Sequence, residues 1–260
     1  MLTAQIQIAT LGAAGVERAA RMCLPSMPGL TYLVSIQNPD GESIDIPATL
    51  RRLDIHTVMY PDRGISLNRN HALALADADI IFIADDDLDY SAEGIDAVRR
   101  YFERHSEVDY VTFRHHGPDN KYFPPVESPL QPREPAGYYL TAFELALRRS
   151  SLTPQVRFSE WFGPGAPYFL AGEDIVMLLT LQRLGLRGMY IPVTVAEHHG
   201  LTTGHRRATP GVLRAQGGYF RLRYGLVEGF VRLIRDIPRR PATPWDAAWY
   251  MLQGFFKKMS

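Results

Sequence analysis

Hydrophobic residues in the first 113 positions recur with two different spacings, which predict strands and helices in alternation. Short runs of β-branched and aromatic residues, such as Ile80–Ala84, are typical of buried strands. Apolar residues at helical spacing lie between these runs, and Ser66 and Ser91 are expected to cap two of the helices. The pattern predicts strands at 6–10, 32–36, 55–60, 80–84 and 108–113, and helices at 15–24, 66–76 and 91–102. Such alternation is typical of an α/β fold with a mostly parallel sheet and helices on both faces.

The regular pattern stops between residues 115 and 135 and then resumes. This segment holds six prolines, too many for a core element, so we predict a long loop that serves as a lid or substrate loop. A second group of glycines and prolines lies at 161–167. The remaining elements predicted are a helix at 173–184, stopped by Gly185, and a strand at 189–196.

Composition narrows the class of protein. The chain has 260 residues, 46% of them hydrophobic, which suffices for a well-developed core. Its 28 basic and 28 acidic residues give a formal net charge of zero, which argues against a general nucleic-acid binder. The single cysteine, Cys23, excludes an internal disulfide framework and a zinc site of several thiolates. The Met1–Ile6 segment is unlike a signal peptide and no apolar run approaches about 18 residues, so we expect a cytosolic protein.

The zero net charge hides an asymmetry along the chain. Residues 204–260 carry eleven Lys and Arg against three acidic residues, a net charge of 11 − 3 = +8, and the rest of the chain has 17 − 25 = −8. Aromatic and aliphatic residues are interleaved with these arginines. One interpretation is an amphipathic surface that lies on an anionic membrane, on its inner face. The alternative is a helical pair that packs on the rest of the protein with its arginines in solvent.

The most informative segment is the apolar strand that runs directly into Asp85-Asp86-Asp87. Open α/β sheets bind ligands at the carboxyl ends of their strands. Residues 85 and 87 of an extended chain point to the same side, so we expect two carboxylates to converge on one Mg²⁺ or Mn²⁺ ion. Acidic residues near the start of a helix are the alternative interpretation.

Three further segments carry candidate chemistry. Arg69 and Asn70 are predicted near the start of a helix, where they suit an anionic ligand. Glu173-Asp174 opens an otherwise apolar helix, a suitable place for a general base whose basicity is tuned by burial. His198-His199 ends a strand, and either imidazole could complete a metal site. Taken singly, each of these is also an ordinary surface feature.

In this order and spacing the segments resemble the family 2 glycosyltransferases of the GT-A fold, over roughly residues 5–200. The matching segments are Gly64-x-Ser66-x-x-Arg69-Asn70-x-Ala72-Leu73, the Asp-x-Asp motif at Asp85–Asp87, Phe158–Ala166, the x-Glu-Asp motif Gly172-Glu173-Asp174, and the late histidine near 198. The resemblance implies a metal-dependent inverting transfer of a hexosyl or N-acetylhexosaminyl group from a nucleotide sugar, most commonly a UDP-sugar. The acceptor would be the hydroxyl of a lipid-linked or growing glycan in surface polysaccharide synthesis.

The resemblance also implies a role for each residue. Asp85, Asp87 and His198, or less favourably His199, would bind Mn²⁺ or Mg²⁺ and through it the diphosphate. Asp174 would take the proton of the acceptor hydroxyl, and Glu173 would orient the acceptor or support the base. The nucleotide sugar would be contacted by Thr10, Arg69, Asn70 and Asp86, and the acceptor by Trp161, Gly163 and Gly165.

The expected organisation is a GT-A catalytic domain at 1–203, with a nucleotide-sugar and metal half (1–113) and an acceptor half (114–203). A basic, amphipathic helical extension would follow at 204–260. The main alternative enzyme is a sugar-phosphate nucleotidyltransferase, but Leu11–Gly15 lacks the basic residue of its phosphate loop. A glycosidase would pair carboxylates without needing a metal or the Arg69-Asn70 segment. A catalytically inactive scaffold at the membrane would not require the acids at 85, 87 and 174.

Overall fold

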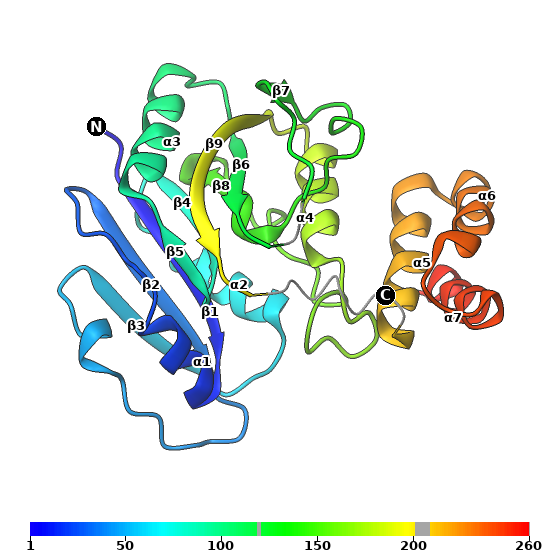
Figure 1. Ribbon diagram of the computed structural model, residues 1–260, viewed down its shortest axis with the longest axis horizontal. Coiled ribbons are helices and arrows are strands. Elements are labelled where there is room, and N and C mark those ends of the chain that lie inside the picture. The colour runs from blue at the N-terminus through cyan, green and yellow to red at the C-terminus, as the bar shows by residue number, and fades with distance from the viewer. Residues whose placement is uncertain (119–120, 201–208, 260) are drawn as a thin grey trace.

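The computed structural model describes residues 1–118, 121–200 and 209–259 (Figure 1). These residues form one nine-stranded sheet in the order β3-β2-β1-β4-β8-β6-β9-β5, with β7 paired to β9. The strands are β1 (Ala4–Leu11), β2 (Leu30–Gln37), β3 (Ile55–Tyr60), β4 (Ile80–Asp85), β5 (Leu88–Tyr90), β6 (Tyr110–His116), β7 (Ser128–Pro129), β8 (Leu145–Arg148) and β9 (Gly188–His198). The helices are α1 (Gly12–Ala19), α2 (Ile65–Ala74), α3 (Ala92–Arg104), α4 (Glu173–Arg183), α5 (Pro210–Tyr224), α6 (Val227–Asp236) and α7 (Pro244–Phe256).

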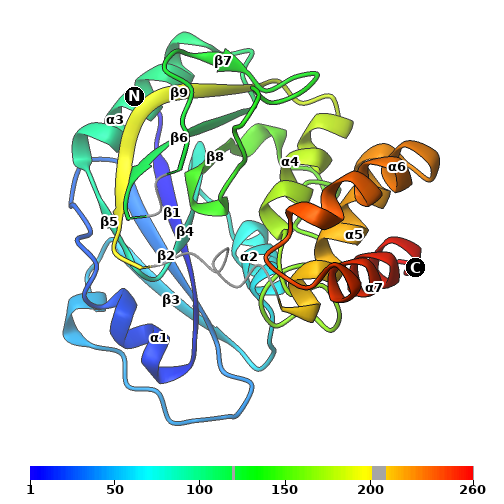
Figure 2. The same cartoon turned by 45° about the vertical axis from the view of Figure 1, so that its right-hand side comes forward.

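The sheet is parallel in its first half and mixed in its second. Strands β3, β2, β1 and β4 all run parallel, and β6 is parallel to β9. Strand β8 is antiparallel to both β4 and β6, and β5 is antiparallel to β9. The mostly parallel α/β architecture predicted from the sequence is therefore confirmed, as Figures 1 and 2 show.

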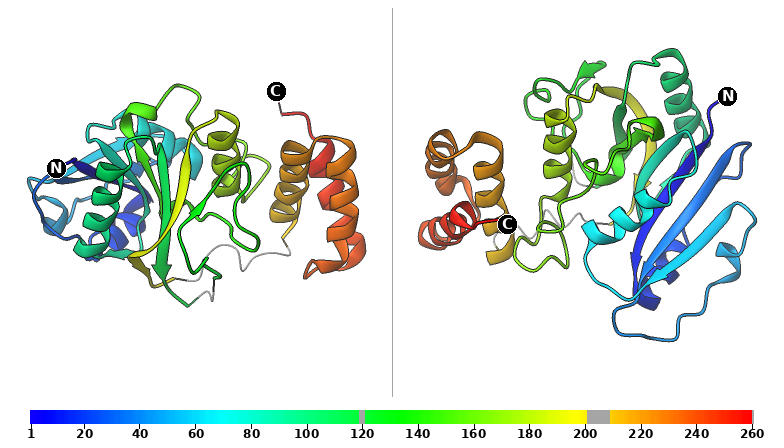
Figure 3. Two further views of the ribbon diagram at one scale, coloured as in Figure 1. Left: turned by 90° about the horizontal axis from the view of Figure 1, so that it is seen from above. Right: turned by 180° about the vertical axis from the view of Figure 1, so that it is seen from behind.

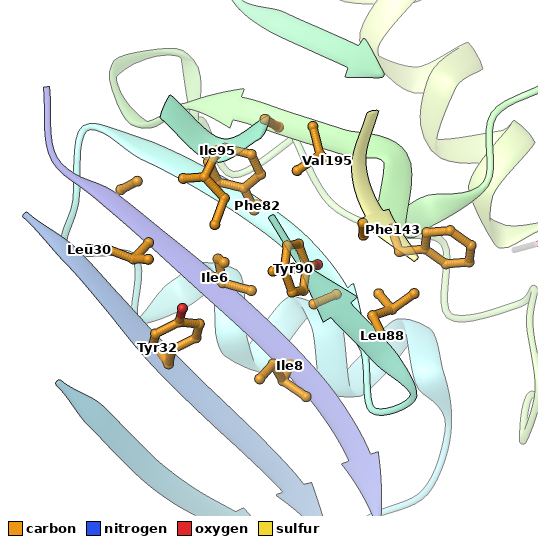
Figure 4. Packing of buried hydrophobic residues seen from close by; sticks show 14 of the residues in the cluster. Ile6, Ile8, Leu30, Tyr32, Phe82, Leu88, Tyr90, Ile95, Phe143 and Val195 are labelled. Atoms are coloured by element: carbon orange, nitrogen blue, oxygen red, sulfur yellow. The ribbon is translucent and has the colours of Figure 1, made fainter. Parts of the chain in front are cut away.

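Strand β4 is apolar from Ile80 to Ala84 because both of its faces are buried there. Ile80, Phe82 and Ala84 pack on one face, in a cluster that also contains residues of α1 and α3 (Figure 4). Ile81 and Ile83 pack on the other face with residues of α2 and α4. A strand buried on both sides reads as a continuous hydrophobic run rather than an alternating one. This burial fixes β4 firmly and delivers Asp85 to the carboxyl edge of the sheet.

Two local predictions are wrong, and in both places a tertiary contact decides. The first helix ends at Ala19 rather than Leu24, because the backbone of Cys23 pairs with β5: its N–H donates to Asp89 and its carbonyl accepts from Tyr90. Helix α2 is capped by Gly64 rather than Ser66, whose hydroxyl instead donates to the carbonyl oxygen of Phe162 at 2.6 Å.

Other predictions are confirmed. The Ser91 side chain caps α3 by accepting from the Gly94 N–H at 3.1 Å. Helix α4 starts at Glu173, and Gly185 follows it with a φ of 72° that terminates the turn. The described part of the proline-rich segment is irregular, apart from the end of β6 and the two residues of β7.

The C-terminal residues form three helices at one end of the molecule (Figure 3). Leu213, Leu233, Met251 and Phe255 are their shared core. Helix α5 also packs on the rest of the protein, through a cluster of Phe162, Phe169, Val176 and Ala215. No helix in the described ranges is long and apolar enough to cross a membrane. The expected boundary at 203/204 lies outside the described residues.

Candidate active site

A cavity of about 650 Å³ opens at the carboxyl edge of the sheet, beside the ends of β1 and β4. Its lining comes from segments far apart in the sequence, and α5 contributes to it through Val212, Ala215 and Gln216. Thr10, Arg69, Asp85, Asp86, Asp87, Glu173, Asp174 and His198 all lie on its wall. The structure thus brings most of the site residues expected from the sequence into one cavity.

The three consecutive aspartates have three different environments. Strand β4 ends at Asp85, and residues 86 and 87 form a turn before β5, so the expectation that 85 and 87 share one side of an extended strand is wrong. Asp85 accepts a hydrogen bond from Arg69 at 2.5 Å, whereas Asp87 lies against His198. Both carboxylates nevertheless line the same cavity.

Asp86 turns towards β1 and α1. It accepts a hydrogen bond from the Thr10 hydroxyl at 2.5 Å and two from the Arg18 guanidinium at 2.9 Å. Burial raises the pKa of Asp86, although the hydrogen bonds from Arg18 and Thr10 favour the carboxylate. Thr10 and Asp86 are therefore partners of each other at the cavity wall. Sequence reasoning missed Arg18, whose only signal was its place in the helix that follows β1.

The structure distinguishes the two adjacent histidines. His198 is buried at the cavity, with Nε2 3.3 Å from an oxygen of Asp87. His199 is exposed and pairs with Asp89 at 2.7 Å, outside the cavity lining. Burial by itself would raise the pKa of Asp87, but the hydrogen bond and charge of His198 hold it below its ordinary value.

The side chains at the cavity wall could supply only some of the ligands that a metal ion needs. Among the described residues, no three His, Cys, Asp or Glu side chains form a group that could hold a metal ion unaided. Asp87 and His198 are adjacent and face the cavity, with Asp85 on the same wall. Nucleotide-binding Mg²⁺ sites commonly use one or two carboxylates and take further oxygens from the phosphates. The donor set therefore suits a cation that arrives with a phosphorylated ligand.

Arg69 connects the two ends of the cavity. Its side chain is 4% exposed, and its guanidinium contacts Asp85 at 2.5 Å and Glu173 at 3.3 Å. It also stacks over the Phe158 ring, 5.3 Å from the ring centre. Because an arginine stays protonated, it fixes a positive charge between these carboxylates.

Asn70 contacts the backbone of a neighbouring segment. Its amide donates to the Phe158 carbonyl oxygen at 3.0 Å and accepts from the Phe158 N–H at 2.8 Å. Asn70 is not one of the described residues that line the cavity. It holds the 158–160 segment against α2. Since α2 starts at Ile65, Arg69 and Asn70 also lie beyond its first turn.

Glu173 and Asp174 occupy the first turn of α4, after Gly172 in a left-handed conformation. Burial, followed by the negative charge of Glu173, raises the pKa of Asp174 to about 7. The Ile175 N–H donates to Asp174 at 2.7 Å and favours the carboxylate, as do the charges of Lys121 and Arg69. A carboxylate with a pKa near neutrality, on the wall of a cavity, is suited to exchanging a proton with a bound ligand.

Of the three residues expected to contact the acceptor, only Gly165 lines the main cavity. Gly165 lines the main cavity and also a neighbouring one of about 290 Å³, which Trp161 lines as well. Gly163 lines neither cavity, but two features require glycine at this position. Its φ is 108°, and a Cβ atom added there would lie only 2.7 Å from the side chain of Ile65. Gly163 therefore allows the 161–167 segment to pack closely on α2.

A second charged cluster beside the cavity was not foreseen from the sequence. Glu144 accepts from Lys121 at 2.5 Å and pairs with His115 Nδ1 at 2.7 Å, and all three side chains are fully buried. Lys121 also donates to the Thr141 hydroxyl at 2.8 Å, and Thr141 lines the cavity. Only the capping arrangement of Thr141 and Glu144 gave a local signal for it.

Comparison with known proteins finds similarity of structure but not of sequence. No family model matches the chain, and no curated protein matches it at a significant level. The structure resembles Staphylococcus aureus TarS with a TM-score of 0.56 and 13% identity, over 98% of this chain and 43% of that one. Residues 1–349 of TarS have been solved in complex with UDP-GlcNAc, and this structure matches with a TM-score of 0.57 and 11% identity, over 97% of this chain and 71% of that one. The complex of the same residues with UDP matches with a TM-score of 0.56 and 12% identity, over 98% of this chain and 89% of that one.

This likeness establishes the fold. TarS is a glycosyltransferase of the GT-A fold, and the match extends over nearly the whole of the present chain. The GT-A architecture with C-terminal helices, expected from the sequence, is therefore confirmed. The chain spans less than half the length of full TarS.

Proposed function

We propose that this protein is an inverting glycosyltransferase that moves a hexosyl or N-acetylhexosaminyl group from a UDP-sugar to the hydroxyl of a lipid-linked or growing glycan. The observation that carries the proposal is the single cavity that joins two acidic ends through Arg69. One end, with Asp85, Asp87 and His198, suits a diphosphate and its cation. The other end, with Glu173 and Asp174, suits the acceptor. The GT-A fold supports this assignment, and TarS has been solved with UDP-GlcNAc.

The proposed reaction uses the raised pKa of Asp174. As a carboxylate, Asp174 removes the proton of the acceptor hydroxyl, whose oxygen forms a bond to the anomeric carbon. The bond from that carbon to the diphosphate breaks on the opposite side, and the nucleoside diphosphate leaves with the electron pair. Arg69 lies next to Glu173 and Asp85, where its positive charge can stabilise the negative charge that develops.

A divalent cation fits the donor end of this cavity. Asp87 and His198, with Asp85 nearby, would hold Mn²⁺ or Mg²⁺ together with phosphate oxygens of the donor. When bound, the cation would neutralise charge on the diphosphate leaving group. Thr10 and Arg18 both donate to Asp86 and keep this carboxylate turned towards β1.

Thermal unfolding with a panel of nucleotides tests the proposal. A ligand that binds only the folded state, present at about 100 times its Kd, adds about 2.7 kcal/mol to the free energy of unfolding. We expect UDP to raise the melting temperature in the presence of Mn²⁺ and not after chelation. The Asp87→Ala variant should lose this shift, whereas the exposed control Asp45→Ala should retain it.

Other outcomes distinguish the alternatives. A rise in melting temperature with a nucleoside diphosphate other than UDP would support glycosyl transfer from a different donor. A shift confined to nucleoside triphosphates would favour the sugar-phosphate nucleotidyltransferase. If no nucleotide raised the melting temperature, the proposal would fail in favour of an inactive scaffold.

A further inference from the structure

The outer face of α6 is apolar although it is exposed. Val227, Phe230, Val231 and Ile234 recur at the spacing of one helical face and are 77%, 39%, 43% and 45% exposed. The opposite face of α6 is buried through Gly229 and Leu233, which pack on α5 and α7. In an ordinary amphipathic helix at a protein surface, the apolar face is buried and the polar face is exposed. In α6 the apolar face is exposed instead.

Helix α7 repeats the arrangement with larger side chains. Trp245, Trp249 and Phe256 lie on one helical stripe and are 86%, 63% and 60% exposed, with the partly buried Leu252 between them. The buried side of α7 consists of Ala247, Met251, Gly254 and Phe255. Helix α7 is therefore apolar on the side facing its neighbours and on the side facing away from them.

The two exposed stripes join into one surface. The Phe230 ring of α6 lies 6.3 Å from the Phe256 ring of α7 and 6.0 Å from the Phe255 ring, measured between ring centres. Both helices lie at the end of the molecule away from β1–β3, as Figures 1 and 3 show. Contiguous exposed apolar surface of this kind marks an interaction site in soluble proteins.

Positive charge borders the apolar surface. Residues 209–259 carry nine Lys and Arg against three acidic residues. The acids are already engaged in part, since Glu228 pairs with Arg232 and Asp236 with Arg240. Within the described part of the chain, no carboxylate lies within 4.0 Å of the side-chain nitrogens of the exposed Arg235 or Arg239. A second copy of this surface would bring like charges together, whereas an anionic surface would neutralise them.

We propose that the outer face of α6 and α7 is a docking surface for an anionic lipid bilayer. The tryptophan and phenylalanine rings would enter the interface between headgroups and acyl chains, where aromatic side chains are favoured. Arg235, Arg239 and Lys258 would contact the negatively charged headgroups. Helix α5 lies between this surface and the cavity, which it lines, so docking would hold the cavity one helix away from the membrane.

Vesicle flotation of the full chain tests this proposal. We expect the protein to float with vesicles of phosphatidylcholine and phosphatidylglycerol, and much less with phosphatidylcholine alone. The double variant Trp245→Ser, Trp249→Ser should partition at least about tenfold more weakly, because it removes two large apolar rings that would leave water at the membrane interface. The matched control Leu53→Ser, Val126→Ser removes two exposed apolar side chains far from α6 and α7 in the sequence and should float like the wild type.

A charge variant separates the two contributions. The double variant Arg235→Glu, Arg239→Glu should bind anionic vesicles at least about tenfold more weakly, because it reverses two charges that would face the negatively charged headgroups. All of these side chains are exposed, so melting temperatures should remain unchanged and confirm that the variants fold. The proposal is overturned if the wild type binds neither kind of vesicle, or if the tryptophan variant floats as well as the wild type.

A second copy of the chain is the competing occupant. Sedimentation equilibrium would reveal it as a dimer that the tryptophan variant dissociates, without vesicle binding. The docking proposal does not depend on the proposed activity. Nucleotide-dependent melting tests the cavity alone, and flotation tests the surface alone.

Discussion

Two clusters of charged side chains lie beside each other in this protein, one closed and one open. In the closed cluster, Glu144 is fully buried between Lys121 and His115, and both of its oxygens have partners. In the open cluster, Asp174 and Glu173 lie on the cavity wall with Arg69, and the wall leaves room for a ligand. The closed cluster has its charges balanced from within, whereas the open one holds two adjacent carboxylates beside a single arginine.

The difference shows how burial serves two purposes. A buried charge with a complete set of partners keeps its charge and holds the chain in place. A buried carboxylate next to a like charge has its pKa raised, as for Asp174, and becomes able to exchange a proton near neutral pH. The two clusters are also coupled, because the charge of Lys121 lowers the pKa of Asp174.

The largest effect should come from Asp174→Asn in the open cluster. Because asparagine cannot accept the acceptor proton, we expect the release of UDP from a UDP-sugar to slow by about 10²- to 10⁴-fold. Asparagine keeps the oxygen that accepts from the Ile175 N–H, so UDP should still raise the melting temperature in the presence of Mn²⁺. An unchanged rate would show that another group is the base.

The next largest effect should be a loss of stability in the closed cluster. Glu144→Ala leaves the buried Lys121 without its counter-ion, which typically costs about 3–5 kcal/mol. For a chain of this size we expect a fall in melting temperature of about 10 °C. The exposed Glu17→Ala is the control and should melt within about 2 °C of the wild type. If Glu144→Ala also melted within this margin, the cluster would not be a stabilising centre.

The smallest effect should appear in the pH dependence of stability. The pKa of Asp174 is raised from 3.8 to about 7 in the folded protein, so the folded state binds the proton more tightly than the unfolded state. The contribution of Asp174 to stability is therefore fully present at low pH and is lost as the pH rises through about 7. Asp174→Asn lacks this loss, so its melting temperature relative to the wild type should increase by a few degrees between about pH 5 and about pH 8. A constant difference would contradict the raised pKa.

The parts of the fold that could be predicted are those set by neighbours in the sequence. The apolar run of β4, the Ser91 cap and the helix starting at Glu173 all follow from residues within a few positions of one another. Backbone periodicity and capping act over that range. The motifs that resemble family 2 glycosyltransferases predicted the GT-A architecture, and the amphipathic pattern of residues 204–260 predicted C-terminal helices. The structure confirms both.

The sequence alone therefore predicted the alternating strands and helices of residues 6–113, the helix at Glu173, and candidate site residues, most of which line the cavity. Tertiary structure decided which partner each residue has: Arg69 meets Glu173 from 104 positions away, and Arg18 meets Asp86 from 68 positions away. It also turned His198 into the cavity and His199 out of it, and used Asn70 for packing. Such pairings depend on where distant strands and helices are placed, which local spacing does not encode. The same holds for α6 and α7. Their helical pattern is local, but packing with α5 decides which of their faces is buried and which is exposed.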